Sequence, residues 1–406
     1  MLSFVSPGDV ASAKHNVSGV QNPAAVLTDQ HRRCSLQCTR SNDELPVLRA
    51  QYVARGVRVL FGSRWRLNRF QERTIVLRTG AKPVLTVDDT EDTFDLTLST
   101  SCELTGSTGI ELTAAAFRVR IRFSTPADAK IWRSLILEAL AHAKWRRDTR
   151  PVKSKFRGVR VVKHVNSSQK FIVKKLTTSN EQGSCLAVQV LRRLYSSWGK
   201  ELVRGYRVVE TEQETLLIMP QLPGVTLLQF LRQRRHNGKK LRENEAWRVL
   251  NALAIQLQTV HRSGVIHCDL NLENVLVAQD LSSVWLIDFD GAYDVLGEDW
   301  QMTGTPGFVA PERVQYPLQA PTAKADVFSL GILLFQALTG QHPYIGANKP
   351  LQLSDSLKLD LSLAERVLTD HCVAPEVRKL IQEMLHVDPQ ARVSMDKVLA
   401  TTRREN

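Results

Sequence analysis

Five short motifs follow one another in the C-terminal half of this 406-residue chain, and they constrain its fold more than any other feature. The first follows a predicted helix and precedes the apolar run VLV. One such motif carries little information, whereas five in this order and spacing are specific. They are HCDLNLEN at 267–274, LIDFDG at 286–291, GTPGFVAPE at 304–312, DVFSLG at 326–331 and HVDPQAR at 386–392.

Together the motifs resemble the catalytic lobe of eukaryotic protein kinases over about residues 223–399. The GTPGFVAPE segment is more similar to Ser/Thr kinases than to Tyr kinases. The resemblance implies that Asp269 orients a substrate hydroxyl and accepts its proton. It implies that Asn274 and Asp288 bind Mg²⁺ through hard oxygen donors, and that Thr305 bridges to the catalytic loop.

The same resemblance assigns structural roles to polar residues of the lobe. Asp326 is expected to be a buried carboxylate that supports the backbone of the catalytic loop. Glu312 and Arg392 are expected to form a buried ion pair. His267 and Phe289 are expected to belong to a packed column of side chains rather than to act chemically.

The segment before this lobe matches the family less clearly. The run KFIVKKL at 170–176 resembles the strand that carries the lysine for the nucleotide phosphates, which would be Lys174. An aromatic residue, Phe156, would then lie at the tip of the phosphate-binding loop. The cofactors implied are ATP and Mg²⁺. The other residues expected to contact the nucleotide are Val159, Met219 and Leu222.

Two departures from the family affect the phosphate-binding region. The three loop positions that usually hold glycine are occupied by Val152, Ser154 and Arg157, and glycine is what lets backbone amides approach a phosphate closely. In addition, the predicted helix LAVQVLRRL places Ala187 where the glutamate partner of Lys174 is expected. A lysine without that carboxylate is less well aimed.

Further departures lie in the catalytic motifs, where Cys268 replaces an arginine, Asn271 a lysine and Asp290 a glycine. Two classes of function therefore stay open. One is a divergent Ser/Thr protein kinase that transfers the γ-phosphate of ATP to a protein. The other is a pseudokinase scaffold or signalling adaptor that binds partners with weak or no catalysis.

Residues 45–144 read as several short strands followed by one helix. Apolar and basic residues alternate from Phe117 to Phe123, which predicts a half-buried strand. Thr125 and Pro126 form a helix start, and Trp132 lies on the apolar face that follows. This pattern resembles a pleckstrin-homology domain, a small bent barrel plugged by its C-terminal helix. The alternative is another small β-sandwich with a helix.

Members of that family that bind phosphoinositides use basic residues near the first two strands, and arginine can donate two hydrogen bonds to one phosphate. The lysine that the family also uses is absent, so a phosphoinositide or acidic membrane surface and a plain protein-docking role both stay open. The candidate lipid-binding residues are Arg58, Arg64, Arg66, Arg69 and Arg73.

The formal net charge of +13 suggests anionic partners. Nucleic acid is not expected, because no nucleic-acid motif accompanies the basic face formed by Arg118, Arg120 and Arg122. The first residues lack the apolar core of a secretory signal, and no apolar run approaches the length of a membrane span. We therefore expect a cytoplasmic protein that binds protein substrates or partners, with peripheral membrane association in the lipid-binding case.

The expected fold class is α+β: a two-lobed protein-kinase fold preceded by a pleckstrin-homology-like β-barrel capped by its C-terminal helix. The expected organisation is a disordered tail at 1–44, the barrel at 45–144, a basic linker at 145–155 and the kinase domain at 156–400. Within the kinase domain, the small lobe is expected at 156–222 and the large lobe at 223–400.

Overall fold

The computed structural model describes residues 47–49, 51–61, 71–88, 92–97, 99–152, 159–176, 186–210, 214–239, 241–297, 300, 302–315, 320–344 and 351–403. The tail expected at 1–44 lies outside these residues. Among the helices of the described ranges, none is both long enough and apolar enough to cross a bilayer.

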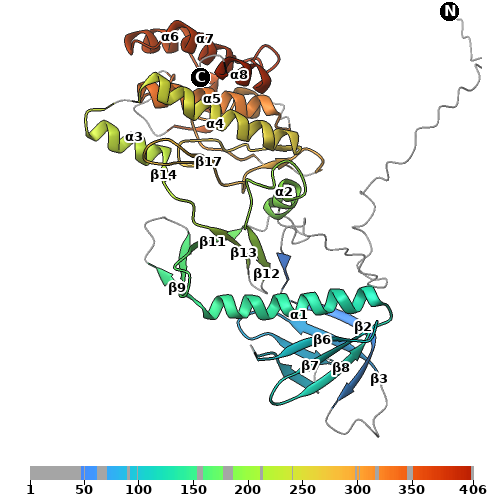
Figure 1. Ribbon diagram of the computed structural model, residues 1–406. Coiled ribbons are helices and arrows are strands. Elements are labelled where there is room, and N and C mark those ends of the chain that lie inside the picture. Colours follow the sequence, from blue (N-terminus) through green and yellow to red (C-terminus); the bar gives the residue numbers. More distant parts are fainter. Residues whose placement is uncertain are drawn as a thin grey trace, which may run out of the picture. The chain divides into compact units, whose positions relative to one another are not determined.

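The N-terminal module is a seven-stranded antiparallel sheet with the helix α1 (Pro126–Arg147) lying along it (Figure 1). The strand order is β5-β4-β3-β2-β8-β7-β6, and within the described residues the end strands β5 and β6 do not pair with each other. The sheet is therefore open, and the expected closed barrel is wrong. The strands are β2 (Gln51–Phe61), β3 (Gln71–Arg78), β4 (Val84–Val87), β5 (Asp92–Asp95), β6 (Ser101–Thr105), β7 (Gly109–Thr113) and β8 (Arg118–Arg122).

Helix α1 covers the apolar face of this sheet. In a closed barrel, pairing between the end strands β5 and β6 would have enclosed that face instead. Trp132 is 2% exposed and stacks on Phe123, and the guanidinium of Arg133 donates to the carbonyl of Cys102 in β6 at 3.1 Å. A covered edge removes the need for β6 to pair with another strand. Because helix α1 covers them, the apolar residues of the module are buried even though the sheet does not close into a barrel.

Local sequence explains where α1 begins and how far it extends. The hydroxyl of Thr125 accepts the backbone N–H of Asp128 at 3.1 Å, and Pro126 occupies the first turn, where its missing N–H costs nothing. The helix runs to Arg147, and the chain re-enters a strand two residues later. The segment expected as a linker at 145–155 thus contains the end of a helix and all of a strand.

A second, six-stranded sheet has the order β1-β12-β13-β11-β10-β9. Strand β1 pairs with β12 in parallel, and every other pair is antiparallel. Both outermost strands, β1 and β9, lie before the kinase domain expected at 156–400. The strands are β1 (Val47–Leu48), β9 (Thr149–Val152), β10 (Arg160–His164), β11 (Lys170–Leu176), β12 (Arg207–Glu210) and β13 (Thr215–Pro220), and the helix α2 (Leu186–Tyr195) follows β11.

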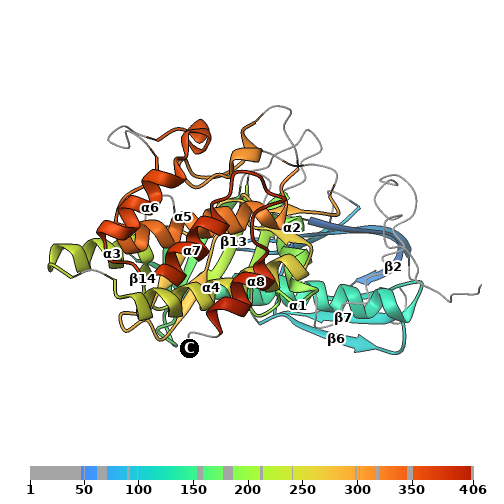
Figure 2. The same cartoon turned by 90° about the horizontal axis from the view of Figure 1, so that it is seen from above.

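The large lobe is mainly helical. Its central element is α5, because residues on every side of this helix are buried. Figure 2 shows α4, α5, α7 and α8 packed together, and contacts among them bury Phe328 and Phe335 completely. The helices are α3 (Leu227–His236), α4 (Glu243–Arg262), α5 (Ala323–Thr339), α6 (Leu361–Asp370), α7 (Pro375–Met384) and α8 (Met395–Thr402), with 3-10 turns η1 (Pro311–Arg313) and η2 (Leu353–Lys358).

Five short strands of the large lobe flank the motifs at 267–274 and 286–291. They form one three-stranded sheet, β14-β16-β17, and one two-stranded sheet, β15-β18. A predominantly β small lobe and a helical large lobe agree with the expected mixed α+β class. The strands are β14 (Val225–Thr226), β15 (Val265–Ile266), β16 (Val275–Val277), β17 (Val284–Leu286) and β18 (Tyr293–Asp294).

Candidate active site

The backbone of the catalytic loop is held by Asp326, a fully buried carboxylate in the first turn of α5. Its two oxygens accept the backbone N–H groups of Cys268 at 2.9 Å and His267 at 2.8 Å. The ring of His261 lies 2.7 Å from the same carboxylate. Burial alone would raise the pKa of Asp326, but the hydrogen bond and charge of His261 lower it. Cys268 has a φ of 63°, and these bonds hold that unfavourable backbone conformation.

Three donors converge on the side chain of Asp269. The hydroxyl of Thr305 donates to Oδ1 at 2.6 Å, and the amides of Asn271 and Asn274 donate to the two carboxylate oxygens at 3.1 Å each. Asn271 also donates to the Thr305 hydroxyl at 2.8 Å. Asn271, which stands where the family has a lysine, therefore links the catalytic loop to the segment that carries Thr305.

Two glycines let that segment pass close to the catalytic loop. Gly304 has a φ of 130°, and a Cβ there would lie 2.5 Å from the Val309 side chain and 3.2 Å from the carbonyl of Cys268. A Cβ on Gly291 would lie 3.2 Å from Cβ of Thr303. A side chain at Gly304 would therefore collide with Val309, and one at Gly291 would crowd Thr303.

Lys174 on β11 lies between two carboxylates that follow β17. Its ammonium is 2.8 and 2.7 Å from the two oxygens of Asp288 and 3.0 Å from Oδ2 of Asp290. Burial alone would lower the pKa of Lys174, but these two charges outweigh it and raise that pKa. Burial alone would raise the pKa of Asp288, yet Lys174 holds it below its usual value. Burial and the charge of Asp288 raise the pKa of Asp290.

The structure brings Lys174 and Asp288 into contact, and sequence reasoning missed the further contact of Lys174 with Asp290. The signal was present, because an additional carboxylate two residues after Asp288 coincided with a missing carboxylate at Ala187. Ala187 is buried in α2, and Leu191, one turn later, is 2% exposed. The rings of His267 and Phe289 pack edge to face at 5.2 Å, as the predicted packed column requires.

The donor set at Asp288 and Asn274 fits Mg²⁺. Asn274 uses its amide nitrogen to donate to Asp269, which leaves the amide oxygen as the atom suited to a cation. Asp288 offers two carboxylate oxygens, and oxygen donors of this kind are those that Mg²⁺ prefers. Asp288 has a φ of 68°, a backbone conformation that its neighbours must hold.

The three remaining nucleotide-contact candidates are half-buried around the small-lobe sheet. Val159 precedes β10, Met219 pairs with Ile172 near the end of β13, and Leu222 follows β13 by two residues. Of the loop positions, Val152 belongs to β9, whereas Ser154, Phe156 and Arg157 lie outside the described residues.

Of the lipid-binding candidates, Arg58 and Arg73 are described, and Arg64, Arg66 and Arg69 lie outside the described residues. Arg58 is exposed on β2, opposite Glu72 and Arg122 on the neighbouring strands. The guanidinium of Arg73 forms an ion pair with the carboxylate of Asp88 at 2.5 Å.

The basic face of β8 is partly neutralised. Glu111 on β7 forms ion pairs with both Arg118 and Arg120. Arg118 and Arg120 thus already have an anionic partner within the sheet.

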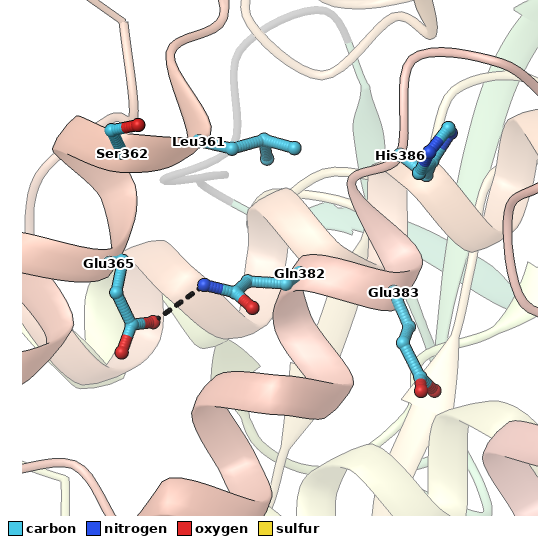
Figure 3. Close-up of a pocket in the computed structure, with 6 residues that line it drawn as sticks. All are labelled: Leu361, Ser362, Glu365, Gln382, Glu383 and His386. Carbon is cyan, nitrogen blue, oxygen red and sulfur yellow. Dashed lines mark hydrogen bonds between the residues drawn. The ribbon is translucent and has the colours of Figure 1, made fainter.

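A pocket opens between α6 and the C-terminal end of α7, and its lining residues include none of the candidate site residues (Figure 3). Gln382 donates to Glu365 across it at 2.8 Å. Glu365 also lies 3.4 Å from Arg378, and Glu383 lies 3.1 Å from Lys397. Because both carboxylates are already paired, we assign no chemistry to this pocket.

Fold and site together define a two-lobed protein-kinase domain. The sequence pattern of the protein kinase domain matches residues 155–402, so this chain belongs to the protein kinase family. The curated proteins that it resembles include Ser/Thr kinases at low sequence identity.

Three relatives illustrate the extent of this similarity. Hormonally up-regulated neu tumor-associated kinase homolog B of Xenopus laevis is 26% identical over 58% of this chain and 38% of its own length. Probable serine/threonine-protein kinase 2 of Plasmodium falciparum is 32% identical over 40% of this chain and 30% of its own length. Ribosomal protein S6 kinase alpha-4 of Homo sapiens is 30% identical over 57% of this chain and 30% of its own length. The matches thus cover only about a third of each relative.

Proposed function

We propose that the chain is an active Ser/Thr protein kinase that transfers the γ-phosphate of ATP to a protein hydroxyl. The observation that carries this proposal is the fixed carboxylate of Asp269, which three donors hold in one orientation. A pseudokinase needs no such arrangement around this group, whereas a kinase needs the carboxylate aimed at the incoming hydroxyl.

In the proposed reaction, the substrate hydroxyl oxygen attacks the γ-phosphorus, its proton passes to Asp269, and ADP leaves. Asp269 acts as the base, and Thr305 and Asn271 keep it in place. Lys174 offers its positive charge to the nucleotide phosphates, and Asp288 and Asn274 would hold the metal. When bound, Mg²⁺ supplies charge neutralisation for the phosphates.

The test compares wild type with Asp269→Asn, using a Ser/Thr peptide library, autophosphorylation and Mg-ATP binding. Since the substitution removes the base but no nucleotide ligand, transfer should fall by at least about a hundredfold while ATP affinity stays within threefold. Equal melting temperatures would show that the substitution leaves the fold intact. Wild type that binds nucleotide but transfers no phosphate to any substrate would contradict the proposal.

That last result would favour the alternative, a pseudokinase scaffold. The observation on its side is the missing carboxylate at Ala187, together with the loss of the loop glycines. A scaffold should still show a Mg²⁺-dependent thermal shift with ATP, which Asp288→Asn should remove. No shift under any condition would leave the nucleotide site without function.

For the N-terminal module we propose a pleckstrin-homology-like domain that recruits a cytoplasmic kinase to anionic membranes. Seven antiparallel strands followed by one covering helix support the family resemblance, and the exposed Arg58 supports a basic contact surface. A protein-docking role is the alternative for the same module.

Liposome binding separates these two roles. The pair Arg64→Ala and Arg66→Ala should weaken binding to phosphoinositide vesicles by about tenfold or more, at about 1 kcal/mol per basic residue. Arg118→Ala, in an arginine already paired with Glu111, is the matched control. Wild type that ignores acidic vesicles at low salt would contradict the lipid proposal and favour protein docking.

A further inference from the structure

Lys174 has two anionic partners, and the proposed reaction gives a role to only one of them. Asp288 is the expected metal ligand, whereas Asp290 stands where the family has a glycine. Asp290 nevertheless lies 3.0 Å from the ammonium, close to the 2.7 Å that separates the ammonium from Asp288. All three side chains are half-buried, so solvent screens these attractions less than it would at the surface.

The helix that usually supplies the partner of this lysine does not supply one here. Helix α2 reads LAVQVLRRLY, which contains no acidic residue, and Ala187 stands where the family resemblance places the partner. The backbone permits a carboxylate at 290, because Asp290 is not among the residues with a positive φ. The close approach to Thr303 is made by the next residue, Gly291. The carboxylate at 290 is therefore compatible with the local fold.

We propose that Asp290 is a positioning residue that replaces the missing helix carboxylate as the anchor of Lys174. The inference rests on the proposed nucleotide-binding function. When Asp288 holds the metal, its oxygens are no longer available to Lys174, and Asp290 is the anion in the described contacts of Lys174 that remains. It then keeps the ammonium aimed at the nucleotide phosphates. The anchoring carboxylate has moved from α2 to the motif after β17.

A double-mutant cycle measured by binding tests this inference in the full chain. The readout is the Kd for ADP with Mg²⁺, from displacement of a fluorescent ADP analogue. Asp290→Ala should weaken ADP by about tenfold in the wild-type background and by less than about twofold in a Lys174→Met background, because contacting residues couple. Asp280→Ala, on an exposed turn, is the control and should change neither value. Equal losses in both backgrounds, or none in either, overturn the inference.

A second variant guards against a folding defect. Ala187→Glu combined with Asp290→Ala should recover ADP affinity to within about threefold of wild type, because it returns a carboxylate to α2. In a peptide assay, Asp290→Ala should lower kcat more than it raises the KM for ATP, since an unanchored lysine is misplaced chiefly in the transition state. Recovery in the double variant would show that the loss in Asp290→Ala comes from the missing carboxylate and not from a folding defect.

The two proposals fail in different ways. A coupled binding cycle without any phosphate transfer by wild type would overturn the proposed activity and support the anchor. Normal transfer with an uncoupled cycle would support the activity and overturn the anchor. Wild type that does not bind ADP at all would overturn both.

Discussion

At the scale of single residues, the catalytic loop depends on one buried anion. Asp326 accepts two backbone N–H groups and contacts His261, and none of these partners lies near it in the sequence. Removing this carboxylate should cost much stability, because the buried N–H groups that it accepts would lose their acceptor where water cannot replace it.

We therefore expect Asp326→Ala to lower the free energy of unfolding by about 3–5 kcal/mol. Asp326→Asn should cost less, since an amide oxygen still accepts one of the two N–H bonds. Urea denaturation of both variants checks this order. Asp370→Ala is the control, because Asp370 is exposed and its loss should change stability by less than about 0.5 kcal/mol. An alanine variant as stable as wild type would show that the loop does not need this support.

At the scale of elements, the segment after Gly291 has an internal anchor. The family arginine that binds a loop phosphate is Cys268 here. A different arginine, the buried Arg313 of η1, lies 5.1 Å from the ring centre of Trp300 and 3.9 Å from the sulfur of Met302. A cation–π contact can order this segment without a phosphate.

Kinase activity should accordingly be independent of phosphorylation in this segment, so phosphatase treatment should leave the rate unchanged. Trp300→Ala should lower kcat by about threefold to thirtyfold, which corresponds to the loss of a cation–π contact of about 0.5–2 kcal/mol. Trp198→Ala removes a tryptophan that is 71% exposed and should have no effect. A large loss on phosphatase treatment that rephosphorylation restores would refute this prediction.

Helix α1 carries a histidine that makes stability depend on pH. Burial, and then the charges of Arg146 and Arg207, lower the pKa of His142 to about 4 from 6.5. The unfolded chain therefore binds more protons between these two values, and stability falls as pH decreases through this window. The full effect is about 3 kcal/mol.

Replacing His142 with Phe should remove this sensitivity while keeping the ring contact with Trp145. Melting temperatures at pH 7, 6 and 5 should fall less in the variant than in wild type. His236→Phe, at the exposed end of α3, is the control and should follow wild type. Parallel curves for His142→Phe and wild type would show that another group causes the acid loss.

At the scale of the whole molecule, the small-lobe sheet extends beyond the segment that matches the kinase family. That match begins at residue 155, yet β1 and β9 precede it. Leu48 of β1 packs in one cluster with Val173, Val209 and Ile218. Trp145 of α1 packs edge to face on Phe171 of β11, in the same strand as Lys174.

A fragment of residues 155–406 should therefore be less stable than the full chain and should aggregate, because it leaves β10 and β12 as unpaired edges. In the full chain, Leu48→Ala should cost about 2–5 kcal/mol. Leu104→Ala, in a leucine that is 43% exposed, is the matched control. Thermal denaturation and light scattering report both effects. A fragment as stable and soluble as the full chain would show that β1 and β9 are dispensable.

Sequence by itself determined the family and predicted the candidate catalytic residues. The motifs at 267–274 and 286–291 are short and local, so the family resemblance that they carry was enough to predict roles for Asp269, Asn274 and Asp288. The alternation in β8 and the cap at Thr125 were equally local, since strand period and helix capping act over a few residues. These features need no knowledge of distant contacts.

The tertiary structure decided what depends on contacts between distant segments. The closed barrel was a wrong prediction, because alternation shows which face of a strand is buried but not whether a helix or a strand covers the edge. The linker at 145–155 looked irregular, because Pro151 and its basic neighbours gave no sign of the pairing between β9 and β10. Lys174 and Asp288 lie 114 residues apart in the chain. Only folding brings these two residues together. The fold also places Asp290, which departs from the family in sequence, against the same lysine.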